Sequence, residues 1–141
     1  VFDNLSVIDN LCLMRPDRSI NQFEAYFDAF PILKSRLRQQ AGTLSGGERK
    51  ILSFVRGLAE PNQLLLLDEP SEGVQQENIE RMERFIDTAK ANGRGFLIVE
   101  QHLAFAESVA NAIMVIDQGR VVLSGKANEI SHAQMLEHLH V

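Results

Sequence analysis

The chain has 141 residues, of which 45% are hydrophobic and 23% are charged, and its formal net charge is −5. A chain of this length can bury the core of one domain, and its hydrophobic content excludes a disordered protein. The acidic balance argues against a nucleic-acid-binding protein, which normally presents a basic face, and no apolar run is long enough to cross a bilayer.

Residues 1–42 have the pattern of short helices separated by turns. Ser6 can cap a first helix, whose apolar positions would be Val7, Ile8, Leu11 and Met14. The single cysteine, Cys12, follows in the same apolar stretch, where we expect a small core residue rather than a nucleophile. One cysteine cannot form an internal disulfide, which fits a reducing, cytoplasmic compartment.

Two further helices are predicted before the sequence changes character. Ser19 and Gln22 have the spacing of a capping box, and apolar residues then recur at helical intervals, at Ile20, Phe23, Phe27 and Phe30. Pro31 is well placed at the first position of another helix, which should run through Leu37 and end at Gly42.

From residue 43 onward, helical and strand patterns alternate. Helices are predicted over residues 46–59, 76–92 and 103–111, strands over 63–68 and 95–99, a hairpin with strands at 113–116 and 121–123, and a last helix capped by Ser131 with Gln134. The first two strands are continuous apolar runs, which are typical of parallel strands buried on both faces. The alternation indicates an α/β fold with helices on the faces of a parallel sheet.

A diglycine opens the helix predicted over 46–59, in the motif L-S-G-G-E that runs from Leu44 to Glu48. Gly46 and Gly47 let backbone amides approach a ligand closely, and the positive end of the helix points to the same place. The Ser45 hydroxyl adds a donor, so the segment suits a nucleotide's terminal phosphate. A purely structural interpretation is that Ser45 and Glu48 form a capping box, and the two are compatible.

The motif L-L-L-L-D-E-P over residues 64–70 places two carboxylates directly after a buried strand. In open α/β sheets, ligands bind at the carboxyl ends of the strands. At this end, Asp68 can hold a Mg²⁺ ion directly or through water. Glu69, the next residue, can orient and deprotonate an attacking water.

With these two motifs in this order, the chain resembles the ATP-binding subunits of ABC transporters: residues 44–48 match the signature motif and residues 64–70 match Walker B with its catalytic glutamate. The resemblance implies that residues 1–42 are the ABC α-helical subdomain, which contacts the membrane-spanning permease. It implies that residues 43–141 are the C-terminal half of a RecA-like P-loop NTPase core. ATP and Mg²⁺ are the implied cofactors, and a second ABC ATPase subunit is an implied partner.

Two positions depart from the usual family pattern. Gln75 stands where most members carry the D-loop aspartate, and Gln101 aligns with the usual switch histidine, which places His102 one position late. Both departures are similar to the ATPases of branched-chain amino-acid and urea importers. The resemblance therefore makes Gln101 and His102 candidate catalytic residues of the switch region and predicts import of such a polar solute.

The sequence contains no G-x-x-x-x-G-K-[ST] loop, the Walker A element that cradles nucleotide phosphates. We therefore expect a partial subunit that lacks the Walker A half and is inactive alone. Its expected place is the cytoplasm, peripheral on the inner face of the cell membrane.

Two alternatives remain open. The chain could be a non-catalytic remnant that docks on an intact ATPase or forms a homodimer through its uncovered sheet edge. It could also be the C-terminal lobe of an SMC or Rad-type chromosome protein, although residues 1–42 lack heptads and the chain is acidic.

Overall fold

The structure is a computed structural model that describes residues 1–13 and 19–138. It divides into two compact units, Val1–Glu100 and Gln101–Val141, each described by itself below. Within the described part of the chain, no helix combines the length and the apolar character that a membrane span requires.

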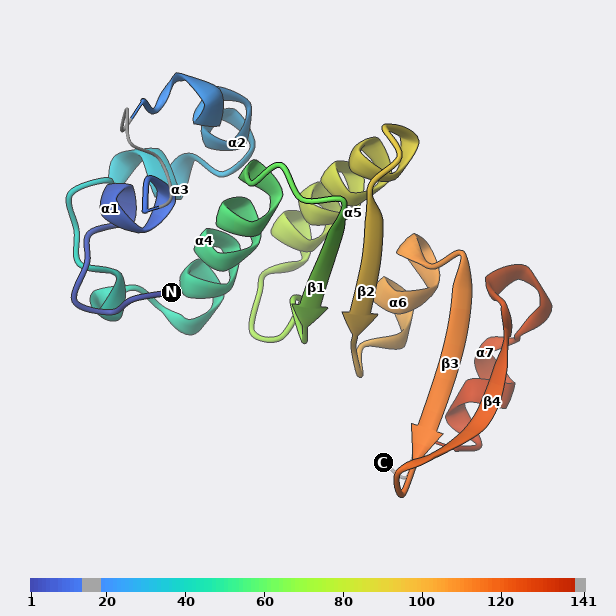
Figure 1. Cartoon of the computed structure of the whole chain (residues 1–141). Coiled ribbons are helices and arrows are strands. Elements are labelled where there is room, and N and C mark those ends of the chain that lie inside the picture. The colour runs from blue at the N-terminus through green and yellow to red at the C-terminus, as the bar shows by residue number, and fades with distance from the viewer. Residues whose placement is uncertain (14–18, 139–141) are drawn as a thin grey trace. The chain divides into compact units, whose positions relative to one another are not determined.

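The first unit begins with short helical segments (Figure 1): α1 (Val7–Leu11), a 3₁₀ turn (Asn21–Phe23), α2 (Glu24–Ala29), α3 (Pro31–Ser35) and a second 3₁₀ turn (Ala41–Thr43). Ser6 caps α1 as predicted, because its hydroxyl accepts a hydrogen bond from the Asp9 amide at 3.1 Å. Cys12 is buried as predicted, whereas Met14 lies outside the described residues. The core of this segment is aromatic, with the buried side chains Phe23, Phe27 and Phe30.

The capping box predicted at Ser19 and Gln22 is wrong. The 3₁₀ turn that follows has Ile20 as its N-cap and no side-chain capping bond, and the Gln22 amide instead donates to the Ser19 carbonyl at 3.1 Å. The apolar spacing identified the buried face correctly, but the polar spacing did not identify the cap, because the first turn is 3₁₀ rather than α-helical.

The helix predicted through Leu37 is shorter than expected. Pro31 does occupy its first turn, but α3 ends at Ser35. Gly42 does not end this helix; it lies in the second 3₁₀ turn, where its amide donates to the Asp3 carbonyl at 3.0 Å. The chain leaves the helix early because residues 39–42 turn back to bond with residues 3–7.

Asn10 fixes this N-terminal stretch from inside. Its side chain is fully buried, and its Oδ1 accepts from the Phe2 amide at 2.8 Å. Its Nδ2 donates to the carbonyls of Phe2 and Ser6, each at 3.0 Å. A buried amide with all these partners is satisfied and therefore pins the loop before α1.

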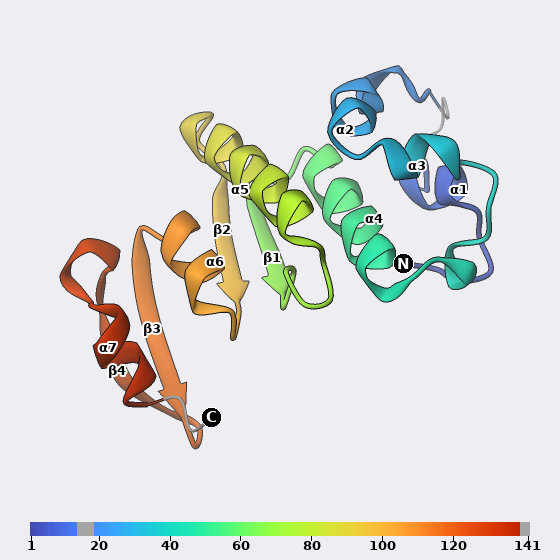
Figure 2. The same ribbon diagram turned by 180° about the vertical axis from the view of Figure 1, so that it is seen from behind.

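The remainder of the first unit is a β–α–β unit preceded by α4 (Gly46–Ala59): β1 (Leu64–Asp68), α5 (Gln76–Ala91) and β2 (Gly95–Val99). β1 and β2 pair in parallel, from Leu64 opposite Gly95 to Asp68 opposite Val99. The helical spacing predicts that Ile79, Met82, Ile86 and Ala89 of α5 face inward; the first three are buried, and Ala89 is only partly covered. Figures 1 and 2 show α5 lying against one face of the two strands.

The opposite face of β1 and β2 is exposed within this unit, so the prediction that both strands are buried on both faces is wrong here. Leu66 is 66% exposed and Leu97, its partner in the register, is 55% exposed. The same face carries Leu64 and Val99, which are also more than half exposed. Only the alternate positions, such as Leu65, are covered.

The C-terminal end of α4 is closed by an arginine from the start of β2. The Arg94 guanidinium donates to the carbonyls of Leu58, Gly57 and Glu60 at 2.6, 3.1 and 2.6 Å. These are among the carbonyls that a helix end leaves without partners, and a cation there also complements the helix dipole. Arg94 therefore ties α4 to the second strand.

The second unit contains α6 (Leu103–Val109), β3 (Ala112–Asp117), β4 (Arg120–Lys126), a 3₁₀ turn (Ala127–Glu129) and α7 (His132–Leu136). β3 and β4 form the predicted hairpin, whose turn residues Gln118 and Gly119 both have positive φ, 45° and 76°. The predicted capping box of Ser131 and Gln134 is confirmed. α6 ends two residues earlier than predicted.

Candidate functional site

The N-terminus of α4 shows the structural interpretation of the L-S-G-G-E segment, the capping box. Ser45 is the N-cap: its hydroxyl accepts from the Glu48 amide at 3.3 Å, and its own amide donates to the Glu48 carboxylate at 2.9 Å. The capping box is therefore confirmed. The same Glu48 carboxylate accepts from Arg36 at 3.0 Å, which connects the helical segment to this end of α4.

The two glycines of this segment have different roles. A Cβ at Gly46 would meet nothing within 4 Å, so the space beside it is open. A Cβ at Gly47 would lie 2.4 Å from the carbonyl oxygen of Gly73, in the loop after β1. The amides of the first helical turn have no partners inside the helix. Gly46 thus lies beside open space, whereas Gly47 is required by packing against the loop.

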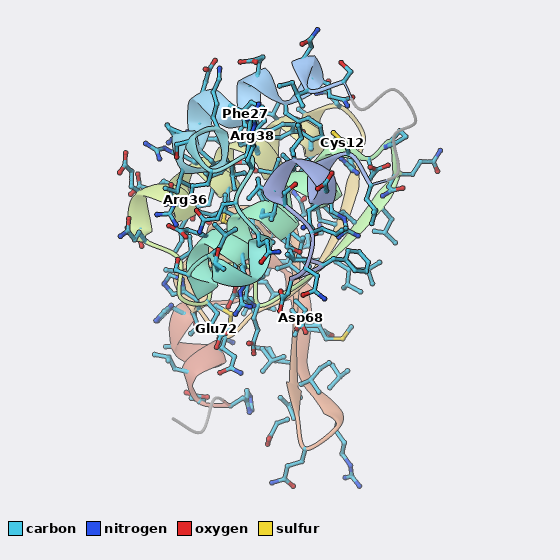
Figure 3. The ribbon with its side chains drawn as sticks, turned by 90° about the vertical axis from the view of Figure 1, so that its left-hand side faces the viewer. Cys12, Phe27, Arg36, Arg38, Asp68 and Glu72 are labelled. Carbon is cyan, nitrogen blue, oxygen red and sulfur yellow. The ribbon has the colours of Figure 1, made fainter. Side chains whose placement is uncertain are left out.

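The acidic pair lies at the carboxyl end of β1, as predicted. Asp68 is the last strand residue and is exposed, and Figure 3 shows it at the same end of the unit as Glu72. Glu69 leaves the strand with a φ of 46°, a left-handed conformation that residues other than glycine rarely adopt. Its amide donates to the Val99 carbonyl at 2.8 Å, which extends the pairing of the two strands by one residue.

Lys50 connects α4 to this acidic segment, and the sequence analysis did not identify it. Its ammonium donates to the Glu69 carbonyl at 2.8 Å and lies 3.5 Å from the Asp68 carbonyl and 3.4 Å from the Glu72 carboxylate. The signal was present, because Gly47 and Lys50 are three residues apart and so share one face of α4. That face is the one that meets the loop.

A second carboxylate holds the other side of the same loop. The Glu100 carboxylate accepts from the Ser71 hydroxyl at 2.8 Å and from the Ser71 amide at 3.2 Å. Ser71 is 5% exposed, so this bond is largely shielded from water. The loop after β1 is therefore anchored to α4 on one side and to the end of β2 on the other.

An open hollow of about 570 Å³ lies beside the start of α4. Its lining includes Gly46 and Gly73 together with the cations Arg49 and Lys50 and the carboxylates Asp3 and Glu72. Each cation has a partner, because Arg49 lies 3.7 Å from Asp3 and Lys50 lies 3.4 Å from Glu72. The hollow is therefore balanced in charge rather than a concentrated anion site.

Across residues 1–13 and 19–138, no group of three His, Cys, Asp or Glu side chains could hold a metal ion. The exposed carboxylate of Asp68 is still suited to Mg²⁺, which is usually held by one or two carboxylates with waters and phosphate oxygens completing its shell. Asp68 therefore fits a Mg²⁺ ion that arrives with a nucleotide.

Gln101 and His102 begin the second unit. His102 is the N-cap residue of α6 and makes no side-chain capping bond there, and both side chains are exposed. The structure therefore tests neither residue as a member of one site with Asp68 and Glu69, and their catalytic role stays a prediction.

The family model described as ABC transporter matches residues 1–72, just over half of the chain. A relative from Pseudomonas aeruginosa, the high-affinity branched-chain amino acid transport ATP-binding protein BraG, is 35% identical over 128 residues, covering 87% of this chain. The chain belongs to the ABC transporter family. The predicted resemblance to ABC transporter ATP-binding subunits is thus confirmed. The predicted similarity to branched-chain amino-acid transport ATPases is confirmed as well.

Other ABC relatives agree. The probable branched-chain amino acid transport ATP-binding protein LivF of Archaeoglobus fulgidus is 32% identical and covers 99% of this chain. The lipopolysaccharide export system ATP-binding protein LptB of Escherichia coli K12 is 33% identical and covers 92%. The chain spans 54% of BraG, 61% of LivF and 56% of LptB, so it corresponds to little more than half of each.

Solved structures show the same fold. The ATP-binding subunit of an ABC transporter superposes with a TM-score of 0.79 at 21% identity, over 92% of this chain and 56% of that one. A bacterial Atm1-family ABC exporter with ATP bound superposes with a TM-score of 0.78 at 21% identity, over 97% of this chain and 26% of that one. The α/β fold of an ABC ATPase is therefore confirmed.

Proposed function

We propose that this chain is the C-terminal part of the ATP-binding subunit of an ABC importer, with residues 1–42 as its α-helical subdomain and residues 43–141 as part of the RecA-like core. One observation carries the proposal: two element ends suited to ligand binding belong to the same unit. They are the start of α4, which Ser45 caps and beside which there is open space, and the end of the parallel strand β1, where Asp68 is exposed. Both belong to the motifs by which the chain resembles its family.

The roles follow from the donors and acceptors present. The Ser45 hydroxyl and the amides of Gly46 and Gly47 would bind a nucleotide phosphate at the positive end of α4, which is 14 residues long. By family resemblance, that nucleotide is held mainly by a second ATPase subunit. Leu44, which is buried, and Glu48, which closes the capping box, would shape this end of the helix.

The acidic pair would serve the chemistry. Asp68 would hold Mg²⁺, which when bound with ATP neutralises charge on the phosphates. Glu69 would orient the attacking water and accept its proton, which is the usual task of a carboxylate beside a transferring phosphoryl group. Gln101 and His102 would complete the switch region.

The proposed solute is a branched-chain amino acid, urea or a similar polar compound. Two relatives support this, since BraG and LivF are both named as branched-chain amino acid transport proteins. Within the proposal, residues 1–42 contact a transmembrane permease, and the subunit lies peripherally on the cytoplasmic face of the membrane.

In this proposal, the groups that bind and hydrolyse the nucleotide come from more than one polypeptide segment. These 141 residues contain no phosphate-binding loop, and the chain corresponds to little more than half of its relatives. The lysine and amides that would hold a nucleotide must therefore come from a segment outside residues 1–141 or from a partner. On its own, this stretch is proposed to be inactive.

The test compares ATP hydrolysis by residues 1–141 alone with hydrolysis after addition of an intact ABC ATP-binding subunit from a branched-chain amino-acid importer. The proposal predicts no turnover by the chain alone. Turnover by residues 1–141 alone that is abolished by Glu69→Gln would show that no outside phosphate loop is needed. The Ser45→Ala variant is the matched control for any stimulation in the mixture, because it removes the hydroxyl proposed to bind phosphate.

The exposed apolar face of the β1–β2 sheet favours one alternative function, a non-catalytic protein that associates with itself or docks on an intact ATPase. Four apolar side chains on that face, Leu64, Leu66, Leu97 and Val99, are each more than half exposed. A contiguous apolar patch of this kind marks a surface that another protein segment normally covers. Sedimentation at increasing concentration distinguishes this function, because it predicts reversible association without nucleotide.

A further inference from the structure

Among the described side chains of α4, Lys50 contacts three groups of segment 68–72: two backbone carbonyls and one carboxylate. Its ammonium donates to the Glu69 carbonyl at 2.8 Å, lies 3.5 Å from the Asp68 carbonyl, and pairs with the Glu72 carboxylate at 3.4 Å. The side chain is 32% exposed, so these contacts are partly shielded from water. Its partners are therefore mainly backbone groups of the predicted catalytic segment.

The contact of Lys50 with the Glu69 carbonyl bears on the backbone conformation of Glu69. Its φ of 46° lies in the left-handed region, which a residue with a Cβ adopts only where the surroundings hold it. On the amide side, Glu69 is bonded to the Val99 carbonyl at 2.8 Å. On the carbonyl side, it accepts from the Lys50 ammonium at 2.8 Å and, over a longer distance of 3.3 Å, from the Glu72 amide, which Lys50→Met leaves in place. Both peptide groups that flank the Glu69 Cα are thus fixed, and with them the direction of its Cα–Cβ bond.

We propose that Lys50 is a positioning residue for Glu69: it holds the left-handed backbone through the Glu69 carbonyl and so aims the carboxylate. This inference rests on the proposed function, because the direction of the Glu69 carboxylate matters only if Glu69 acts on the attacking water. It also couples α4 to the site, because Lys50 lies within the first two turns of the helix whose start is proposed to bind phosphate. A displacement of α4 would move the carbonyl bond and hence the carboxylate.

A simpler role for Lys50 is an ion pair with Glu72 that only adds stability. Different substitutions distinguish the two roles. Glu72→Gln removes the ion pair and leaves both backbone carbonyls available to Lys50, whereas Lys50→Met removes all three contacts with a side chain of similar length. Lys50→Arg keeps a cation that can still donate to the carbonyls. Lys90→Met is the matched control, because Lys90 also pairs with a carboxylate, Asp87 at 3.1 Å, and is 23% exposed.

The first experiment measures amide hydrogen exchange of segment 69–74 in the chain of residues 1–141. Lys50→Met should speed exchange in this segment by about tenfold, the effect of losing one hydrogen bond to a charged donor. Glu72→Gln and Lys90→Met should leave it near the wild-type rate, and Lys50→Arg should restore most of the protection. Unchanged exchange in Lys50→Met would overturn the proposal, as would an equal effect of Glu72→Gln.

The second experiment measures ATP turnover in the complete protein as its cell produces it, with its partner polypeptides. Lys50→Met should lower kcat by about tenfold or more with little change in KM for ATP, because a misplaced base affects the chemical step and not nucleotide binding. An unchanged kcat in Lys50→Met, beside a Glu69→Gln variant that has lost turnover, would refute the positioning role and leave the proposed function intact. Turnover indifferent to Glu69 would refute the proposed function, and the exchange experiment would then decide the Lys50–Glu69 contact alone.

Discussion

A Cβ at Gly47 would lie 2.4 Å from the carbonyl oxygen of Gly73, closer than side-chain carbons approach a backbone oxygen. The first turn of α4 and the loop after β1 are therefore in direct backbone contact. This contact explains why the second glycine of the diglycine is needed for the fold of the chain. It is independent of any ligand.

The two glycines should respond differently to alanine. Gly47→Ala must displace the loop and should lower the free energy of unfolding by about 1–3 kcal/mol, the range for inserting a methyl group into a filled space. Gly46→Ala has open space around its Cβ and should leave stability unchanged or raise it by about 0.4–1 kcal/mol. Urea denaturation of the two variants measures both values. Equal effects would contradict the packing role assigned to Gly47.

Arg94 should be important for the stability of α4. Arg94→Met removes the donors to the carbonyls of Leu58, Gly57 and Glu60, and we expect the free energy of unfolding to fall by about 2–3 kcal/mol. Arg84→Met is the matched control, since Arg84 is an exposed arginine on α5 and its loss should cost less than about 0.5 kcal/mol. Thermal or urea unfolding compares the two; a loss no greater than the control's would show that Arg94 is not a cap.

Replacing Asn10 should lower the free energy of unfolding about as much as replacing an apolar core residue. Asn10→Ala leaves the Phe2 amide without its partner, while the Phe2 carbonyl keeps its bond from the Leu5 amide at 3.1 Å, and we expect a destabilisation of about 1–3 kcal/mol. The exposed Asn128→Ala provides the comparison and should change stability by less than about 0.5 kcal/mol. Amide exchange localises the effect: residues 2–6 should lose protection first. Uniform loss across the unit would mean that Asn10 acts on the whole core and does not pin this loop.

Lysine substitutions at two neighbouring leucines of β1 should have opposite effects on folding, because one leucine is exposed and the other is buried. Leu66 is 66% exposed, so Leu66→Lys should preserve folding and reduce any concentration-dependent association in sedimentation experiments. Leu65 is 9% exposed and faces α4, where its side chain would touch a Cβ at Gly57, so Leu65→Lys should unfold the unit. If Leu66→Lys associates as strongly as the wild type, the exposed face is not the contact surface.

The sequence supported most of the fold because local signals and packing agree in the second half of the first unit. Ser45 and Glu48 cap α4 as their spacing predicts, and the apolar runs at 64–68 and 95–99 are parallel strands. The errors lie where tertiary contacts override local signals. α3 ends at Ser35 because the chain turns back toward residues 3–7, which no short-range pattern encodes.

The site was predicted less completely than the fold. The positions of Asp68 and Glu69 follow from the strand that precedes them, so sequence reasoning places them well. Lys50 bonds to a backbone carbonyl, and the bond from Ser71 to Glu100 joins two side chains far apart in the sequence. Helical spacing can place Lys50 on the face of α4 that meets the loop, but it does not identify these partners, so the contacts became visible only in the structure.

We propose that Glu69 activates water for ATP hydrolysis. Glu69→Gln in the complete protein tests this role, with ATP binding and ATP hydrolysis measured on the same sample. ATP should still bind, while kcat should fall by a factor on the order of 10²–10⁴, the usual contribution of a general base. Hydrolysis at the wild-type rate in Glu69→Gln would show that Glu69 is not the base.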